Sequence, residues 1–259
     1  MNKFRYPILA KPSGITLERH RLDVMSEGEL LSKEMPFVFD KYEDLVGKSL
    51  LSRLICVCKF HDDGKAEIWQ VACQKDYDAY LKWKQKNAGG TYKDYTRESY
   101  NIVGSNIRQA GVRHEFYSLL LNANKKMPLC LQAAIAAHHG KLGFDNEERW
   151  KNEGFLSYWN SFLKKSNDIC ENEILEHIAR MQYEFAGPRG LLQLADHRAS
   201  AKEDGDYVPN FSPFHYTFPH KSKRGVQKLV ERHWNDDILL VRAPTGAGKT
   251  DASLLWASL

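Results

Sequence analysis

The sequence lacks several features that would place a chain in a common class at once. It has no run approaching the roughly 18 apolar residues of a membrane span. Its N-terminus has no long apolar stretch followed by a small-residue cleavage site. Its five cysteines are scattered and form no CxxC pair, which argues against a disulfide framework and a thiolate zinc site. We therefore expect a cytoplasmic protein with reduced, buried thiols and no membrane contact.

Neither positive nor negative charge dominates the chain. Lys and Arg number 37 against 33 Asp and Glu, which gives a net charge of +4. This balance permits a nucleic-acid partner without requiring one. The length of 259 residues and the 42% hydrophobic content are ample for a core, so disorder is not expected.

The hydrophobic pattern up to about residue 200 predicts a mainly helical domain, because apolar residues recur at spacings of three and four. Thr16 is the expected N-cap of a helix that carries His20. A second helix is expected from Leu50 to Gly64, and Gly140 is expected to cap a helix that ends at His139. Further helices are expected over residues 112–124, 129–139, 155–165, 171–184 and 188–200.

The segment 76–100 departs from this pattern, and we predict a loop-rich excursion there because Gly89 and Gly90 interrupt it. Its composition suits a platform for single-stranded nucleic acid, with cations for phosphates and rings for bases. Packing of the rings on the core is the favoured alternative, because nothing in the sequence places them on one face. The residues concerned are Lys82, Lys84, Lys86, Lys93, Tyr77, Tyr80, Trp83, Tyr92 and Tyr95.

Histidine and aspartate residues form the main chemical signal. The pair His61–Asp62 lies near a predicted helix end, where an imidazole and a carboxylate can converge on one cation. Alone, such a dipeptide is weak evidence. Five histidines and two aspartates at helix ends or inward faces follow the chain order H, HD, H, HH, D. They are His20, His61, Asp62, His114, His138, His139 and Asp196.

This order resembles the HD phosphohydrolase superfamily. More narrowly, three pieces are similar to the HD nuclease of the type I CRISPR-associated nuclease-helicase, which the Cascade surveillance complex recruits. They are RHE-x-x-S from Arg113 to Ser118, HHG from His138 to Gly140, and D-x-x-A-S from Asp196 to Ser200. The resemblance covers most of residues 15–200. Asp63 departs from it, because the family usually has an apolar residue there.

The resemblance implies two metal ions that share Asp62. One would be held by His20, His61, Asp62 and Asp196, and the other by His114, His138 and His139. Imidazole-rich ligation favours manganese, iron, cobalt, nickel or zinc over magnesium, which prefers oxygen ligands. Lys65 is expected to neutralise charge that develops on the phosphate, and Ser200 to hydrogen-bond a neighbouring phosphate. Asp62, Lys65 and Ser200 are thus the expected catalytic residues.

The C-terminal part differs in composition. From Asp204 the chain is rich in Gly, Pro, Ser, Asn and aromatics, and then basic, so residues 204–225 are expected to be a linker. An amphipathic stretch at 226–233 and a predicted buried strand at 237–241 follow.

The sequence APTGAGKT comes next, at 243–250. With Ala for the first Gly, it matches the phosphate-binding loop of NTPases and resembles superfamily 2 helicases. The expected ATP-binding residues are Gln227, Thr245, Gly246, Gly248, Lys249 and Thr250. Only nine residues follow Thr250. We therefore expect no helicase activity here, and a role for ATP and magnesium only in a full-length protein.

Three domain assignments follow: an HD nuclease domain over 1–203, a linker over 204–225 and a truncated RecA-like α/β fragment over 226–259. The expected activity is endo- or exonucleolytic cleavage of single-stranded DNA in type I CRISPR interference, by a monomer that Cascade recruits as part of the full-length protein. Two alternatives stay open. One is a nucleotide phosphohydrolase of the same superfamily, and the other is a catalytically silent docking module.

Overall fold

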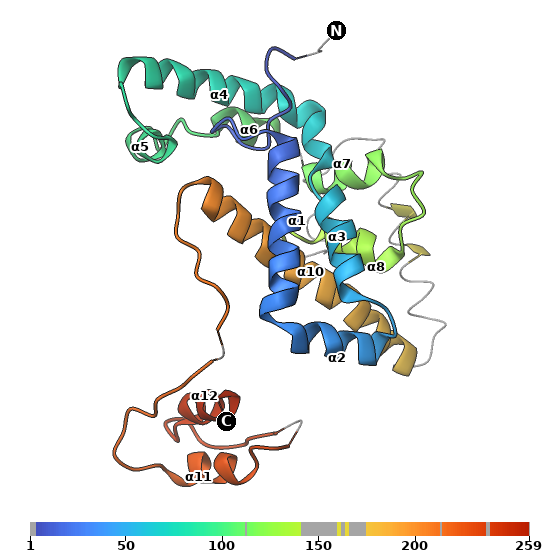
Figure 1. Ribbon diagram of the computed structural model, residues 1–259, viewed down its shortest axis with the longest axis vertical. Coiled ribbons are helices and arrows are strands. Elements are labelled where there is room, and N and C mark those ends of the chain that lie inside the picture. The colour runs from blue at the N-terminus through green and yellow to red at the C-terminus, as the bar shows by residue number, and fades with distance from the viewer. Residues whose placement is uncertain are drawn as a thin grey trace. The chain divides into compact units, whose positions relative to one another are not determined.

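The computed structural model describes residues 4–111, 113–140, 160–161, 164–165, 175–212, 214–236 and 239–258. The chain divides into two compact units, Met1–Pro209 and Asn210–Leu259 (Figure 1). The described residues are mainly helical, as predicted, and within them an isolated antiparallel bridge between Leu9 and Thr16 is the one β-type pairing. None of their helices combines the length and apolarity needed to cross a bilayer.

The first unit is a set of packed helices. α1 contacts both α3 and α10, and α10 also contacts α8. In Figure 1 these helices form the centre of the unit, and α4 lies at the end opposite α2. The elements are α1 (Leu17–Glu34), α2 (Pro36–Val46), α3 (Leu50–Phe60), η1 (Asp63–Ala66), α4 (Ile68–Lys86), α5 (Tyr92–Glu98), α6 (Ser105–Ala110), α7 (His114–Leu121), α8 (Leu129–Ala136) and α10 (Leu175–Glu203).

The start of α1 confirms the predicted cap. The Thr16 side chain accepts a hydrogen bond from the Arg19 backbone amide at 3.2 Å, which satisfies one of the free donors of the first turn. His20, Val24 and Leu31 are buried on one face of the helix, as their spacing requires. This face turns His20 toward the interior.

α3 ends earlier than predicted. It stops at Phe60, with His61 as its C-cap, and the separate 3₁₀ turn η1 follows. The chain turns at Gly64, where it lies against α7: a Cβ on Gly64 would be 2.0 Å from the His114 carbonyl oxygen. The close approach of these two backbones therefore depends on glycine.

α10 is one helix, whereas two were predicted over 171–184 and 188–200. Pro188 lies inside it and cannot donate a backbone hydrogen bond to the Glu184 carbonyl. The Tyr42 hydroxyl donates to that carbonyl instead, at 3.4 Å. Gly187 leaves room for the ring, because a Cβ there would meet Tyr42 at 2.8 Å. Replacement of the lost bond allows the helix to continue through the proline.

The prediction of a loop-rich excursion over 76–100 was wrong. α4 continues to Lys86 and α5 begins at Tyr92, after Thr91 and Asp94 have formed a capping box. The tyrosine and tryptophan rings pack on one another, with Tyr80 centroids 5.0 Å from Tyr92 and 5.5 Å from Tyr95. Contacts between rings on the two helices explain the order of this segment.

The end of α8, the segment 155–165 and the cysteines were also the subject of predictions. α8 ends at Ala136 with Ala137 as its cap, and Gly140 does not have the positive φ of a capping glycine. The predicted helix over 155–165 falls mostly outside the described residues. Among the described cysteines, Cys58 and Cys73 are buried, Cys56 and Cys130 are half-buried, and all four are free thiols.

The second unit holds α11 (Gly225–Arg232) and α12 (Lys249–Ala257). Residues 237–238 of the predicted strand are outside the described part, and residues 239–241 form no strand. A parallel strand needs a neighbour with which to pair, and the described part of this unit supplies none.

A buried ion pair joins α1 to α10. Glu27 on α1 accepts from the Arg198 Nε atom at 2.8 Å and from Lys202. Burial raises the pKa of Glu27, but the bonds to these two cations lower it by more than burial raises it. The net shift of the pKa is therefore downward.

We expect Glu27→Met to lower the free energy of unfolding by about 3 kcal/mol at pH 7, because it leaves a buried arginine without one of its partners. A carboxylate with a lowered folded-state pKa stabilises above its unfolded pKa and loses that contribution as pH falls through the folded value. The difference in the free energy of unfolding between variant and wild type should therefore become smaller below about pH 4.5. Urea unfolding at several pH values measures it, and a gap independent of pH would contradict the assignment.

Candidate metal centre

The structure brings together the seven predicted ligands from five segments of the first unit. Their ligand atoms form two groups, and within each group all atoms lie within 4.8 Å of one another. One group is Asp62, His114, His138 and His139, and the other is His20, His61 and Asp196. The division matches the two sets that the sequence predicts, with Asp62 placed by this measure in the first.

Asp62 faces both groups. Its Oδ2 atom is 3.3 Å from His20 Nε2 and 3.5 Å from His61 Nε2. Its Oδ1 atom is 3.1 Å from His114 Nε2 and 3.9 Å from His138 Nε2. A carboxylate whose two oxygens face different imidazole sets is the arrangement needed to bridge two cations.

Two histidines are held so that their lone pairs point inward. His61 Nδ1 lies 2.8 Å from the Cys58 carbonyl oxygen, and His138 Nδ1 lies 2.6 Å from that of Ile135. A carbonyl can only accept, so each Nδ1 carries the proton and each Nε2 keeps its lone pair. Both Nε2 atoms are buried with no hydrogen-bond partner.

Buried polar atoms without partners are rare in folded proteins, and two such nitrogens near the Asp62 carboxylate require an explanation. Metal-ligating histidines show this pattern, with one ring nitrogen bonded to a backbone carbonyl or carboxylate and the other free for the ion. The donor set therefore fits a divalent metal, and better a transition metal than magnesium.

Three site histidines are favoured in their neutral form. Burial lowers the pKa of His61 and of His138. At His139, partial loss of hydration where its ring packs on His138, together with the neighbouring His114, lowers the pKa to about 4. Neutral imidazole is the form that binds metal, so these rings need lose no proton at neutral pH.

His20 differs. Burial by itself lowers its pKa, but hydrogen bonds with three carboxylates outweigh this and raise the pKa to about 10. These carboxylates belong to Asp196, Asp62 and Glu203. In the metal-free protein His20 thus carries a positive charge, and a metal cation would take the place of its Nε2 proton.

The two other predicted catalytic residues lie beside the ligands. Lys65 is buried, and its Nζ atom donates to Asp62 Oδ2 at 2.6 Å. Burial raises the pKa of Asp62, but His61 and Lys65 outweigh this effect and hold it well below its usual range. Ser200 is one helical turn beyond Asp196, with its Oγ atom 3.4 Å from the Asp196 carboxylate. In this structure each contacts a predicted ligand directly.

Solvent reaches the centre from one side. His139 is exposed and the His114 side chain is 12% exposed, whereas the other five predicted ligands are buried. A substrate would therefore approach past these two histidines.

Sequence reasoning missed several residues that hold the site. Ser118 accepts from the Gly64 amide at 2.8 Å and donates to the His61 carbonyl at 2.6 Å, which ties η1 to α7. The signal was present, since Ser118 closes the RHE-x-x-S piece. Glu203 contacts His20 and Lys11, and its one sequence signal is its spacing of seven from Asp196 on α10.

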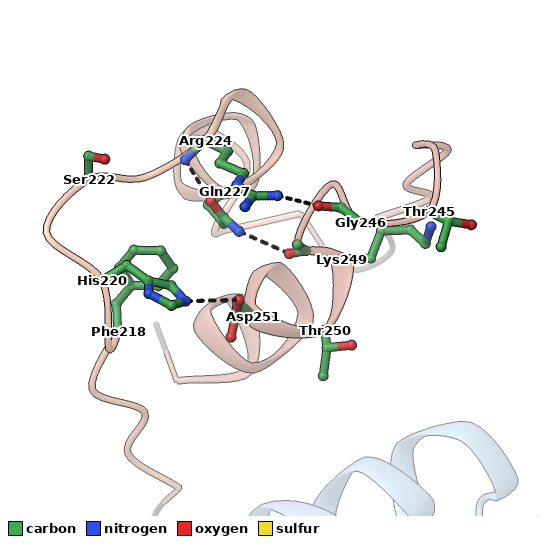
Figure 2. Close-up of a pocket in the computed structure, with 11 residues that line it drawn as sticks. Phe218, His220, Ser222, Arg224, Gln227, Thr245, Gly246, Lys249, Thr250 and Asp251 are labelled. Carbon is green, nitrogen blue, oxygen red and sulfur yellow. Dashed lines mark hydrogen bonds and ion pairs between the residues drawn. The ribbon is translucent and has the colours of Figure 1, made fainter.

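The second unit has a pocket of about 600 Å³ around the sequence APTGAGKT. Figure 2 shows Gln227 between Arg224 and the glycine loop, and its amide accepts from the Arg224 backbone and donates to the Gly248 carbonyl at 3.0 Å. Gly246 and Gly248 have φ of +80° and +84°, which favour glycine. All six predicted ATP-binding residues line this pocket.

The loop leads into the N-terminus of α12, which begins at Lys249. The Lys249 ammonium donates to the carbonyls of Ala243 and Pro244 at 2.9 and 3.1 Å. Free amides at a helix start and a nearby ammonium can hold a phosphate group.

Comparison with protein-family models, with curated proteins and with solved structures found no match to this chain.

Because a Cβ on Gly64 would overlap the α7 backbone, we expect Gly64→Ala to lower the free energy of unfolding by about 3 kcal/mol. Gly190→Ala is the matched control, since nothing lies within 4 Å of that position on α10. It should raise stability by roughly 0.5–1 kcal/mol, as expected for a glycine inside a helix. Chemical denaturation of the two variants measures both effects, and equal effects would be inconsistent with the close approach.

Proposed function

We propose that the first unit is a metal-dependent nuclease of the HD superfamily that cleaves single-stranded DNA. The observation that carries this proposal is that two imidazole-rich groups lie on either side of the Asp62 carboxylate. In each group one buried Nε2 atom, that of His61 or His138, has no hydrogen-bond partner. The resemblance of the RHE, HHG and D-x-x-A-S pieces to the nuclease of the type I CRISPR system supports the same assignment.

A pair of divalent transition ions, when bound, would supply Lewis acidity and an activated water for hydrolysis of a phosphodiester. Asp62 would hold both ions, because its carboxylate faces both imidazole groups. Lys65 keeps Asp62 oriented and offsets the charge of this buried carboxylate. His114 and His139 line the open side, where the phosphate of a strand would enter.

The second unit supports a nucleic-acid substrate. We propose that it belongs to a helicase motor domain and that, in a full-length protein, Lys249 and the loop amides bind ATP phosphates with magnesium. This rests on the loop sequence, the positive φ of its glycines and the pocket that Gln227 closes. In a full-length protein, ATP-driven strand separation and recruitment by Cascade are what the resemblance implies.

Two other functions are compatible with the same fold. A nucleotide phosphohydrolase would use the same ligands on a small substrate, and a docking module would use none of them. The buried unpartnered nitrogens disfavour a docking module, because burying them costs free energy that a metal would recover. The phosphate-binding loop favours the nuclease over the nucleotidase.

We expect the metal-stripped protein to degrade circular single-stranded DNA when manganese, cobalt or nickel is added, and less with magnesium. Asp62→Ala should reduce the rate by at least about 100-fold, the loss typical of removing one preorganised electrostatic group. His139→Ala should also reduce it, and because His139 is exposed this variant is expected to fold normally.

His177→Ala is the control, since His177 is exposed and outside both ligand groups. It should cleave at the wild-type rate. Release of phosphate or deoxynucleoside from nucleotides, without cleavage of the circle, would establish the nucleotidase instead. Absence of both activities in a folded, metal-loaded protein would favour the docking module.

A further inference from the structure

Glu203 is a buried carboxylate that the proposed reaction does not use. Its side chain is 4% exposed, and its Oε1 atom is 2.8 Å from His20 Nδ1. It lies two helical turns after Asp196 on α10, so both carboxylates approach the same imidazole from one helix face. Asp196 faces His20 Nε2 at 3.2 Å, and Glu203 faces the opposite nitrogen.

Lys11 holds Glu203 from the other side. Its Nζ atom is 2.8 Å from Glu203 Oε2 and donates to the Ser200 carbonyl at 3.2 Å. The Ser200 carbonyl belongs to the last turn of α10, where a cation also interacts favourably with the helix dipole.

The position of Lys11 is itself determined by the turn that precedes α1. The Ala10 amide donates to the Ile15 carbonyl at 2.8 Å, and the Leu9 amide donates to Gln70 Oε1 on α4 at 2.8 Å. A chain of contacts therefore runs from α4, through this turn and Lys11, to Glu203 and His20.

We propose that Glu203 is a positioning residue that holds His20 with its Nε2 atom toward Asp62 and Asp196, and that Lys11 keeps Glu203 in place. The inference rests on the proposed metal-dependent function. A ring nitrogen bonded to a carboxylate orients the imidazole and makes its other nitrogen a stronger ligand.

His20 is unusual among the site histidines in this respect. His61 and His138 are oriented by backbone carbonyls, which no side-chain substitution removes. Glu203 contacts His20, which belongs to the group of His20, His61 and Asp196 and not to the group around His114. Loss of Glu203 should therefore weaken one metal site and leave the other unchanged.

The test is titration of the metal-stripped protein with cobalt(II), followed by the visible absorption of the bound ion and by calorimetry. Glu203→Met removes the acceptor, whereas Glu203→Gln keeps an oxygen that can accept from Nδ1. Glu203→Met should bind one of two cobalt ions about 10- to 100-fold more weakly than wild type. Glu203→Gln should restore most of that affinity, and Lys11→Met should give an intermediate loss.

Glu27→Met is the matched control, because it also removes a buried ion-paired glutamate between α1 and α10 but contacts no predicted ligand. It should lower thermal stability without changing either cobalt affinity. Circular dichroism of each variant separates folding from binding.

Identical cobalt isotherms for wild type and a folded Glu203→Met would overturn the positioning role alone. Equal losses in Glu203→Met and Glu27→Met would also overturn it, by assigning the effect to helix packing. A wild-type protein that binds no cobalt would instead overturn the metal-dependent function on which the inference rests.

Discussion

The structure of the first unit is organised around one buried carboxylate, that of Asp62. An unpaired charge in such a position would be prohibitively costly. Lys65 compensates it directly, and the protonated His20 does so from the α1 side. Burying the group thus required that a cation and several imidazoles be packed beside it, and the helices that supply them could not be arranged independently.

The helices meet this requirement through close backbone contacts. α1 and α10 pack along each other, which places His20 opposite Asp196. Gly64 lets η1 lie against α7, which brings Asp62 to His114. The ligands can therefore be precise although several of them follow helix ends, because each end is hydrogen-bonded to a neighbouring element.

Much of this arrangement was accessible from the sequence. The spacing of apolar residues predicted α1, α3, α7 and α8, and the resemblance carried by the histidine and aspartate pieces implied which side chains would lie together. Features that depend on residues far apart in the chain could not be predicted from the sequence. The continuity of α10 through Pro188 depends on the Tyr42 hydroxyl, and the helices of segment 76–100 depend on contacts between Tyr80, Tyr92 and Tyr95. Glu203 was missed because both groups that it contacts, His20 and Lys11, lie near the opposite end of the unit's sequence.

The distribution of the ligands along the chain has a consequence for biogenesis. His20 lies on the first helix and Asp196 near the end of the last helix of the unit. A nascent chain that has not yet released α10 from the ribosome lacks Asp196 and Glu203, two of the three carboxylates around His20. The His20 side of the cluster can therefore form only after α10 has been synthesised and has packed against α1. The group of Asp62, His114, His138 and His139 contains no residue of α10 and can assemble first.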